Sequence, residues 1–126
     1  MFITIDPADT RPIYRQVADE IKALIARGEL FEGTQLPPVR QLAGDLGVNL
    51  NTIATAYRQL QDEGLIAIKH GSGAVVASRR VLETGEQDLR RPLRTVLTQL
   101  VLSGIGPADI MRMVSEELAG LTREES

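Results

Sequence analysis

The chain has 126 residues, of which 43% are hydrophobic, and it carries a formal net charge of −3 at pH 7 with no Cys. This length suits one ordinary domain, or a small domain with an appendage, and the scarcity of aromatic residues means that the core must be aliphatic. The absence of Cys excludes disulfide bonds and thiolate metal sites, and no apolar run approaches the roughly 20 residues of a membrane-spanning helix. Since the first residues also lack a signal-peptide pattern, we expect a cytoplasmic protein without a membrane partner.

A predicted amphipathic helix spans residues 13–27. Pro12 stands at its start, where a missing N–H is harmless, and Gly28 ends it. A polar connector then leads to Pro37 and Pro38, which suit the start of another helix. The apolar residues of the first helix recur at helical spacing and are predicted to face the core: Ile13, Val17, Ala18, Ile21, Leu24 and Ile25.

Residues 39–46 predict a two-turn helix, because their apolar positions 39, 42, 43 and 46 form one stripe. Gly47 and Asn49 then predict a tight turn, in which glycine supplies backbone freedom and Asn49 supplies a side-chain oxygen for helix capping. The next helix is predicted over about residues 50–63, and Gly64 follows at the expected C-terminal position.

Two strands are predicted directly after this pair of helices. Residues 65–69 and 74–77 are rich in Ile, Val and Ala, and residues 70–73, with two glycines, join them as a hairpin. Helix, turn, helix and hairpin is the order of a winged helix-turn-helix, in which the second helix enters the DNA major groove and the hairpin, or wing, flanks it.

The outward face of the helix at 50–63 supplies the first candidate DNA contacts. Its inward residues are predicted to be Ile53, Ala56, Tyr57 and Leu60. The outward residues are Leu50, Asn51, Ala54, Thr55 and Arg58. Asn51 can pair bidentately with adenine, and the Thr52 hydroxyl with the free N–H groups of the helix start can bind a phosphate. For Asn49, capping is favoured over base contact.

Further candidate contacts flank this helix. Arg40, in the first turn of the preceding helix, can reach a phosphate or a groove edge. At the hairpin tip, Lys69, His70 and Gly71 combine cations with a backbone that can approach DNA closely, although glycine pairs also occur in ordinary tight turns.

The charge balance counts against DNA binding at first sight, because Lys and Arg supply most non-specific affinity. Residues 1–78 carry seven Lys or Arg and nine Asp or Glu. Arg40, Arg58, Lys69 and His70, however, all fall within or beside the predicted DNA-binding elements. We therefore expect an acidic body with a small basic face.

The character of the chain changes after residue 77. Residues 78–88 are polar and predict a linker or the lead-in of a helix. Two amphipathic helices follow, over about 89–103 and 108–121, separated by a glycine and proline break. Helices of this size leave surplus apolar surface after pairing with each other, so we infer a two-helix dimerisation unit. The alternative is that both helices pack back on the first domain.

Four motifs, with the opening of the first helix, resemble the signature of GntR-family bacterial transcription regulators. They are residues 36–43 (LPPVRQLA), 47–52 (GVNLNT), 60–66 (LQDEGLI) and 70–73 (HGSG), together with 12–17 (PIYRQV). The short two-helix tail is similar to that of the YtrA subfamily. The resemblance implies DNA contacts at Arg40, Asn51, Thr52, His70 and Gly71. The chain departs from the pattern at Pro38, where a capping Ser is usual, and at Leu50 and Ala54, where relatives often have Arg.

The expected fold is mainly α with a small β-hairpin: a winged helix-turn-helix domain (1–78), a linker (79–88) and a two-helix dimerisation tail (89–126). The expected function is that of a homodimeric, sequence-specific DNA-binding regulator, a repressor that recognises a palindromic double-stranded operator. A winged-helix module that binds a protein partner is the alternative. A small-molecule effector in a cleft of the dimer remains open. No enzyme, cofactor or metal is expected, because the chain has no HExxH or Walker motif and only one His.

Overall fold

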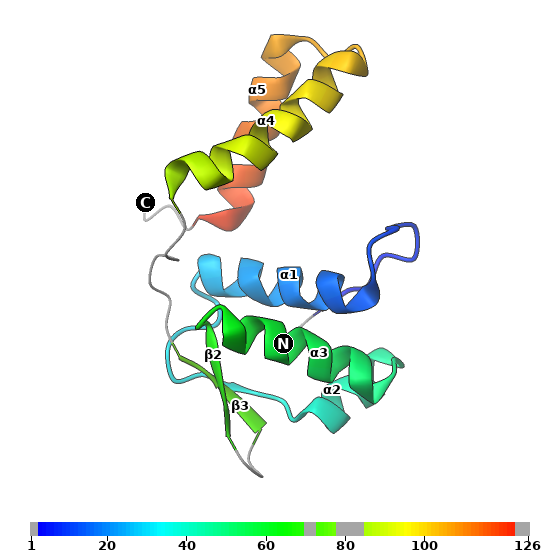
Figure 1. Ribbon diagram of the computed structural model, residues 1–126, viewed down its shortest axis with the longest axis vertical. Coiled ribbons are helices and arrows are strands. Elements are labelled where there is room, and N and C mark those ends of the chain that lie inside the picture. Colours follow the sequence, from blue (N-terminus) through cyan, green and yellow to red (C-terminus); the bar gives the residue numbers. More distant parts are fainter. Residues whose placement is uncertain (1–2, 70–72, 78–84, 123–126) are drawn as a thin grey trace. The chain divides into compact units, whose positions relative to one another are not determined.

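The computed structural model describes residues 3–69, 73–77 and 85–122 (Figure 1). The chain divides into two compact units, Met1–Arg80 and Val81–Ser126. Two of the predicted DNA contacts, His70 and Gly71, and most of the predicted linker lie outside the described residues.

The first unit combines three helices with a small antiparallel sheet, in the strand order β1-β3-β2. Its elements are α1 (Ile13–Ala26), β1 (Gln35–Leu36), α2 (Val39–Leu46), α3 (Leu50–Asp62), β2 (Ile66–Lys69) and β3 (Gly73–Val76). The three helices and the hairpin are confirmed within one or two residues of the predicted bounds, so the fold is the predicted winged helix-turn-helix. The two-residue β1, which pairs with β3 at Gln35↔Val75 and Leu36↔Ala74, was not predicted.

The core lies where α3 packs against both α1 and α2 (Figure 1). It is aliphatic, as the composition predicts, except for the aromatic ring of Tyr57. The side chains that are essentially inaccessible to solvent include Val17, Ile21, Ile53, Leu60 and Tyr57. Each such aliphatic side chain contributes about 1.5–3 kcal/mol on burial. The inner face of the hairpin closes the core from the side, since Ile66, Ala74 and Val76 are buried as well.

The start of α1 corrects one prediction. Ile13, which was expected on the buried face, is 40% exposed, and Gln16 is buried at 5%. The Gln16 side chain is stabilised there by two hydrogen bonds: its Oε1 accepts from the Asp6 N–H at 3.0 Å, and its Nε2 donates to the Arg11 carbonyl at 3.3 Å. A polar side chain can be buried when the backbone satisfies it, and here it fixes the segment that precedes α1.

The turn between α2 and α3 has the predicted chemistry. Gly47 adopts a φ of 68°, a left-handed conformation that glycine tolerates best. Asn49 is the N-cap of α3, because its Oδ1 accepts a hydrogen bond of 2.7 Å from the Asn51 N–H. Helix α2 begins without a side-chain cap, since its N-cap residue is Pro38.

A single side chain ties α3 to the segment before α2. The Tyr57 hydroxyl donates a 2.6 Å hydrogen bond to the Pro37 carbonyl. Burial raises the pKa of this hydroxyl above its ordinary value of about 10. Tyr57 therefore positions the start of α2 relative to the middle of α3.

The second unit is a helical hairpin of α4 (Glu86–Leu102) and α5 (Pro107–Leu121) (Figure 1). Helix α4 begins at Glu86, inside the segment expected as a linker, because Glu86 and Asp88 favour a first turn although the apolar period starts later. Among the described residues of this unit, Ile110 is the buried hydrophobic side chain. The other apolar side chains of the hairpin are half-buried or exposed. Within the described part of the chain, no helix has both the length and the apolar character needed to cross a membrane.

Replacing Tyr57 by Phe is expected to lower the free energy of unfolding by about 1 kcal/mol, because it deletes the hydrogen bond to Pro37. Since the folded-state pKa of Tyr57 is raised, its contribution is fully present below the unfolded pKa of about 10 and is lost as pH rises beyond it. The difference between wild type and Tyr57→Phe should therefore be constant between about pH 7 and 9 and shrink at higher pH, as measured by urea denaturation. Tyr14→Phe is the matched control and should cost close to nothing, and an equal cost for both variants would contradict this role for Tyr57.

Candidate nucleic-acid interface

The outward face of α3 offers two adjacent rows of side chains. An α-helix stacks positions four apart, so Leu50, Ala54 and Arg58 form one row, and Asn51 and Thr55 form the next. Leu50, Asn51 and Arg58 are exposed, and Thr52, Ala54 and Thr55 are half-buried. The predicted inward residues, Ile53, Ala56, Tyr57 and Leu60, are all buried. The core therefore fixes the rotation of α3 about its axis and thus which residues it presents.

The N-terminal end of α3 has the character of an anion-binding site. The first N–H groups of a helix lack intrahelical partners, and the helix dipole adds positive potential there. Asn49 satisfies two of these donors, because its Oδ1 accepts from the Asn51 N–H at 2.7 Å and its carbonyl accepts from the Thr52 N–H at 3.0 Å. No acidic residue lies in the first turn. Thr52, half-buried in the same turn, carries a hydroxyl beside the remaining donors.

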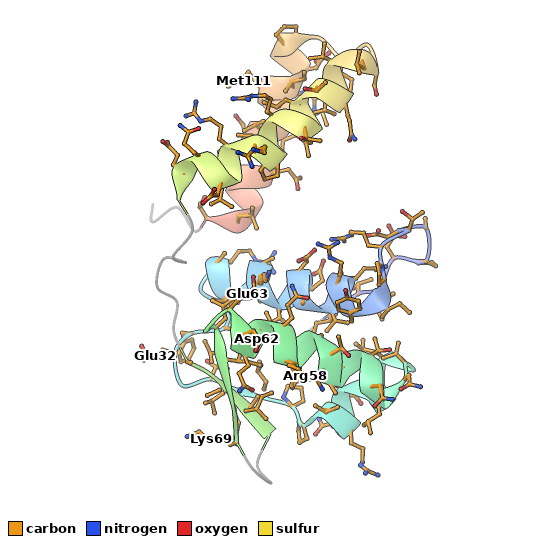
Figure 2. All side chains as sticks on the ribbon, in the orientation of Figure 1. Glu32, Arg58, Asp62, Glu63, Lys69 and Met111 are labelled. Carbon is orange, nitrogen blue, oxygen red and sulfur yellow. The ribbon has the colours of Figure 1, made fainter. Side chains whose placement is uncertain are left out.

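The wing and the start of α2 lie against each other. Gly73 has a φ of 80°, and a Cβ there would lie 3.3 Å from the Leu36 carbonyl oxygen and 3.6 Å from the Pro38 Cα. Arg40, exposed in the first turn of α2, is two residues from this contact. Figure 2 shows Lys69 at the outer end of β2, directed away from the sheet. The fold therefore brings Arg40 and the described part of the wing to one region of the first unit.

The acids of α3 lie at its far end. Asp62 is twelve residues beyond Leu50, about 18 Å along the helix axis, and Figure 2 shows it beside Glu63 at the C-terminal end. The Lys22 Nζ lies 2.8 Å from the Glu63 Oε1 and partly neutralises that carboxylate. A small basic face can thus exist on a unit with excess acid, because the negative charge of α3 is concentrated away from its first turns.

Sequence patterns alone did not identify two residues that shape this surface. Tyr57 was predicted only as an inward side chain, and its bond to Pro37 depends on a contact across 20 positions. Gly73 was predicted only as part of the hairpin loop, whereas its contact with Pro38 explains why a residue without a side chain is required there. The presence of glycine at position 73 was the one feature of the sequence from which this close contact could have been inferred.

These features define a winged helix-turn-helix DNA-binding protein, and comparisons with known proteins identify its family. Residues 13–76 match the family described as "Bacterial regulatory proteins, gntR family". The chain is 33% identical over 102 residues to the HTH-type transcriptional repressor YtrA of Bacillus subtilis (strain 168), covering 79% of this chain and 76% of that protein. The chain belongs to the GntR family and is a YtrA-like transcriptional regulator with a DNA-binding winged helix.

Solved structures agree with this assignment. A transcriptional antiterminator from Listeria monocytogenes EGD-e has a TM-score of 0.86 and 26% identity, with 100% of this chain and 98% of that chain covered. The DNA-binding domain of AraR, solved in complex with operator ORX1, has a TM-score of 0.53 and 30% identity. That match covers 59% of this chain and 92% of the AraR chain. A winged helix similar to the first unit thus binds operator DNA in AraR.

Gly73→Ala is expected to lower the free energy of unfolding by about 1–2 kcal/mol, because an L side chain is strained at this positive φ and its Cβ meets the Leu36 carbonyl. Gly44→Ala is the matched control. A Cβ at Gly44 meets nothing within 4 Å, so alanine in this exposed helical position should stabilise the protein by about 0.5–1 kcal/mol. Thermal denaturation of both variants measures the difference, and a Gly73→Ala protein as stable as wild type would refute the close contact.

Proposed function

We propose that this protein is a homodimeric transcriptional repressor that binds a palindromic DNA operator, with one winged helix on each half-site. The observation that carries the proposal is that three elements with exposed residues belong to one compact unit: the first turns of α3, the first turn of α2 and the described part of the wing. A recognition surface of this kind fits a major groove and the phosphates beside it. The two-fold symmetry of a dimer would be mirrored in a palindrome with half-sites about one helical turn apart.

Within this proposal α3 lies in the major groove with its N-terminal turns deepest. The Asn51 amide pairs with the N6 and N7 atoms of an adenine, and Thr55 contacts a neighbouring base edge. The N–H groups at the start of α3 that Asn49 does not satisfy, with the Thr52 hydroxyl, hold a phosphate oxygen. Leu50 faces the bases, and Asn49 acts through its cap of the helix.

The flanking cations position the protein on the backbone. Arg40 and Arg58 neutralise phosphates on either side of the groove, and Lys69 with His70 and Gly71 contacts the backbone or the minor groove through the wing. Contacts of this kind add affinity for every sequence, whereas base contacts supply discrimination.

The second unit supplies the dimer in this proposal. Leu89, Leu93 and Val96 form an exposed stripe at positions i, i+4 and i+7 of α4. Met111, Leu118 and Leu121 form a second exposed stripe on α5. A second copy of the same hairpin would bury both stripes, which a monomer leaves in water at a cost of about 25 cal/mol per Å². The division of labour is then DNA binding by residues 1–78 and dimerisation by the tail that begins with α4 at Glu86, with the residues between them as the connection.

Arg40→Ala and Asn51→Ala are each expected to weaken operator binding about tenfold or more. Arg40→Ala loses a charge-assisted phosphate contact, and Asn51→Ala loses a base contact worth about 1–3 kcal/mol. Fluorescence anisotropy with labelled DNA from upstream of the protein's own gene, in excess random competitor, measures the affinities. Arg15→Ala, which removes an exposed Arg from α1, is the control and should retain wild-type affinity. Wild-type binding by both test variants would overturn these contacts.

Lys69→Ala should separate affinity from specificity. Because Lys69 is assigned to phosphate, its loss should weaken binding to operator and random DNA by the same factor. Asn51→Ala should instead reduce the ratio of operator to random affinity. Equal effects of both variants on that ratio would show that the division between phosphate and base contacts is wrong.

Leu93→Glu is expected to convert the dimer to a monomer. Leu93 is the middle residue of the apolar stripe on α4 and is 53% exposed in a single copy, so the variant places a charge where the dimer would bury an apolar side chain. Thr98→Glu adds the same charge on the opposite side of α4 and should leave the dimer intact. Sedimentation equilibrium of both variants provides the measurement. A wild-type monomer, or a dimeric Leu93→Glu variant, would refute dimerisation through this stripe.

The net charge of −3 favours one alternative, a winged-helix module that binds a protein partner. This alternative expects no DNA binding at low salt and a stable complex in a pull-down. The proposed repressor expects competitor-resistant binding that weakens as salt is added.

A further inference from the structure

The first two turns of α3 present an apolar row where a DNA-binding helix needs base contacts. Leu50, the first residue of α3, is 43% exposed, and Ala54, one turn further on, is half-buried on the same side. Neither side chain can donate or accept a hydrogen bond. The first charge in this row comes from Arg58, two turns along, and the next from Asp62 at the far end of α3.

The major groove offers such side chains one apolar partner. Guanine and cytosine edges present acceptors and a donor, and adenine presents one of each, whereas thymine alone presents its C5-methyl group beside O4. Leucine placed over a G·C edge would strip water from polar groups without replacing their hydrogen bonds, which is costly. Leucine placed over a thymine methyl group would bury two apolar surfaces against each other.

We propose that Leu50, with Ala54 beside it, is a specificity-determining residue that selects thymine through its 5-methyl group in each operator half-site. This inference rests on the proposed function, because it requires α3 to enter the major groove. Asn51 lies next to Leu50 and is suited to adenine, so the two residues together favour A·T pairs beneath the first turn of α3.

The test begins with in vitro selection of binding sites from a pool of random DNA duplexes, using the full-length protein. In the selected site each thymine is then replaced singly by deoxyuridine, which removes only the methyl group and keeps the base pair. Anisotropy measures the affinity for each duplex. We expect one or two positions in each half-site where the loss is about fourfold, as for one buried methyl-sized group, and about 15-fold when both half-sites are changed.

Leu50→Ala then links the effect to the residue. This variant should bind duplexes with thymine and with deoxyuridine at those positions about equally, although its overall affinity also falls. Ile13→Ala is the matched control, since Ile13 is exposed to a similar degree, 40%, at the first residue of α1. It should retain the full thymine preference, and thermal denaturation checks that both variants are folded.

The outcomes separate the inference from the proposed function. Selection without any enriched site overturns the proposed function and this inference together. An enriched site that lacks thymine at corresponding positions of its half-sites overturns the inference alone. The inference alone is also overturned if deoxyuridine binds as well as thymine, or if Leu50→Ala keeps the full preference.

Discussion

The buried face of α3 is the constraint on which the rest of the first unit depends. Ile53, Ala56, Tyr57 and Leu60 are all withdrawn from solvent between α1, α2 and the hairpin. Rotating the helix would expose these side chains and bury Asn51 and Arg58, at a cost of several kcal/mol. The outward row is therefore a consequence of core packing, and the same packing that stabilises the fold selects which residues can meet a ligand.

Two contacts between residues distant in the sequence fix the segment that precedes α2. The Tyr57 hydroxyl holds the Pro37 carbonyl, and the bare Cα of Gly73 lets β3 approach Pro38. Both contacts converge on the short segment that precedes α2, so the start of α2 is positioned against α3 from one side and against the wing from the other. Arg40, in the first turn of α2, is therefore positioned by both contacts. In the function that we propose, Arg40 and the described part of the wing lie together for this reason, and they supply a local basic face on a unit that carries an excess of acid.

The sequence predicted the parts of the fold that have a period. Helices α1, α2 and α3 each carry an apolar stripe long enough to fix their bounds, and Gly47, Asn49 and Gly64 mark their ends. It did not predict β1, because two residues have no period and their pairing depends on β3, about 40 positions away. Gln16 was missed for a related reason, since its burial depends on backbone partners at Asp6 and Arg11 rather than on hydrophobicity.

The residues of the candidate site also divide into those whose roles the sequence predicted and those whose roles it did not. The outward residues of α3 followed from helical spacing, and the cap at Asn49 followed from the turn chemistry. The roles of Tyr57 and Gly73 did not, because each depends on a neighbour distant in the chain. The tail shows a further limit: acidic residues at 86 and 88 start α4 earlier than its apolar period indicates.

The most direct test of the account is an anisotropy titration of the wild-type protein with DNA from upstream of its own gene, in excess random competitor and at several salt concentrations. We predict competitor-resistant binding whose logarithmic affinity falls linearly with the logarithm of salt concentration, at about 0.9 per phosphate neutralised. Absence of binding at the lowest salt concentration, or binding that random DNA displaces as readily as operator DNA, would contradict sequence-specific recognition by α3.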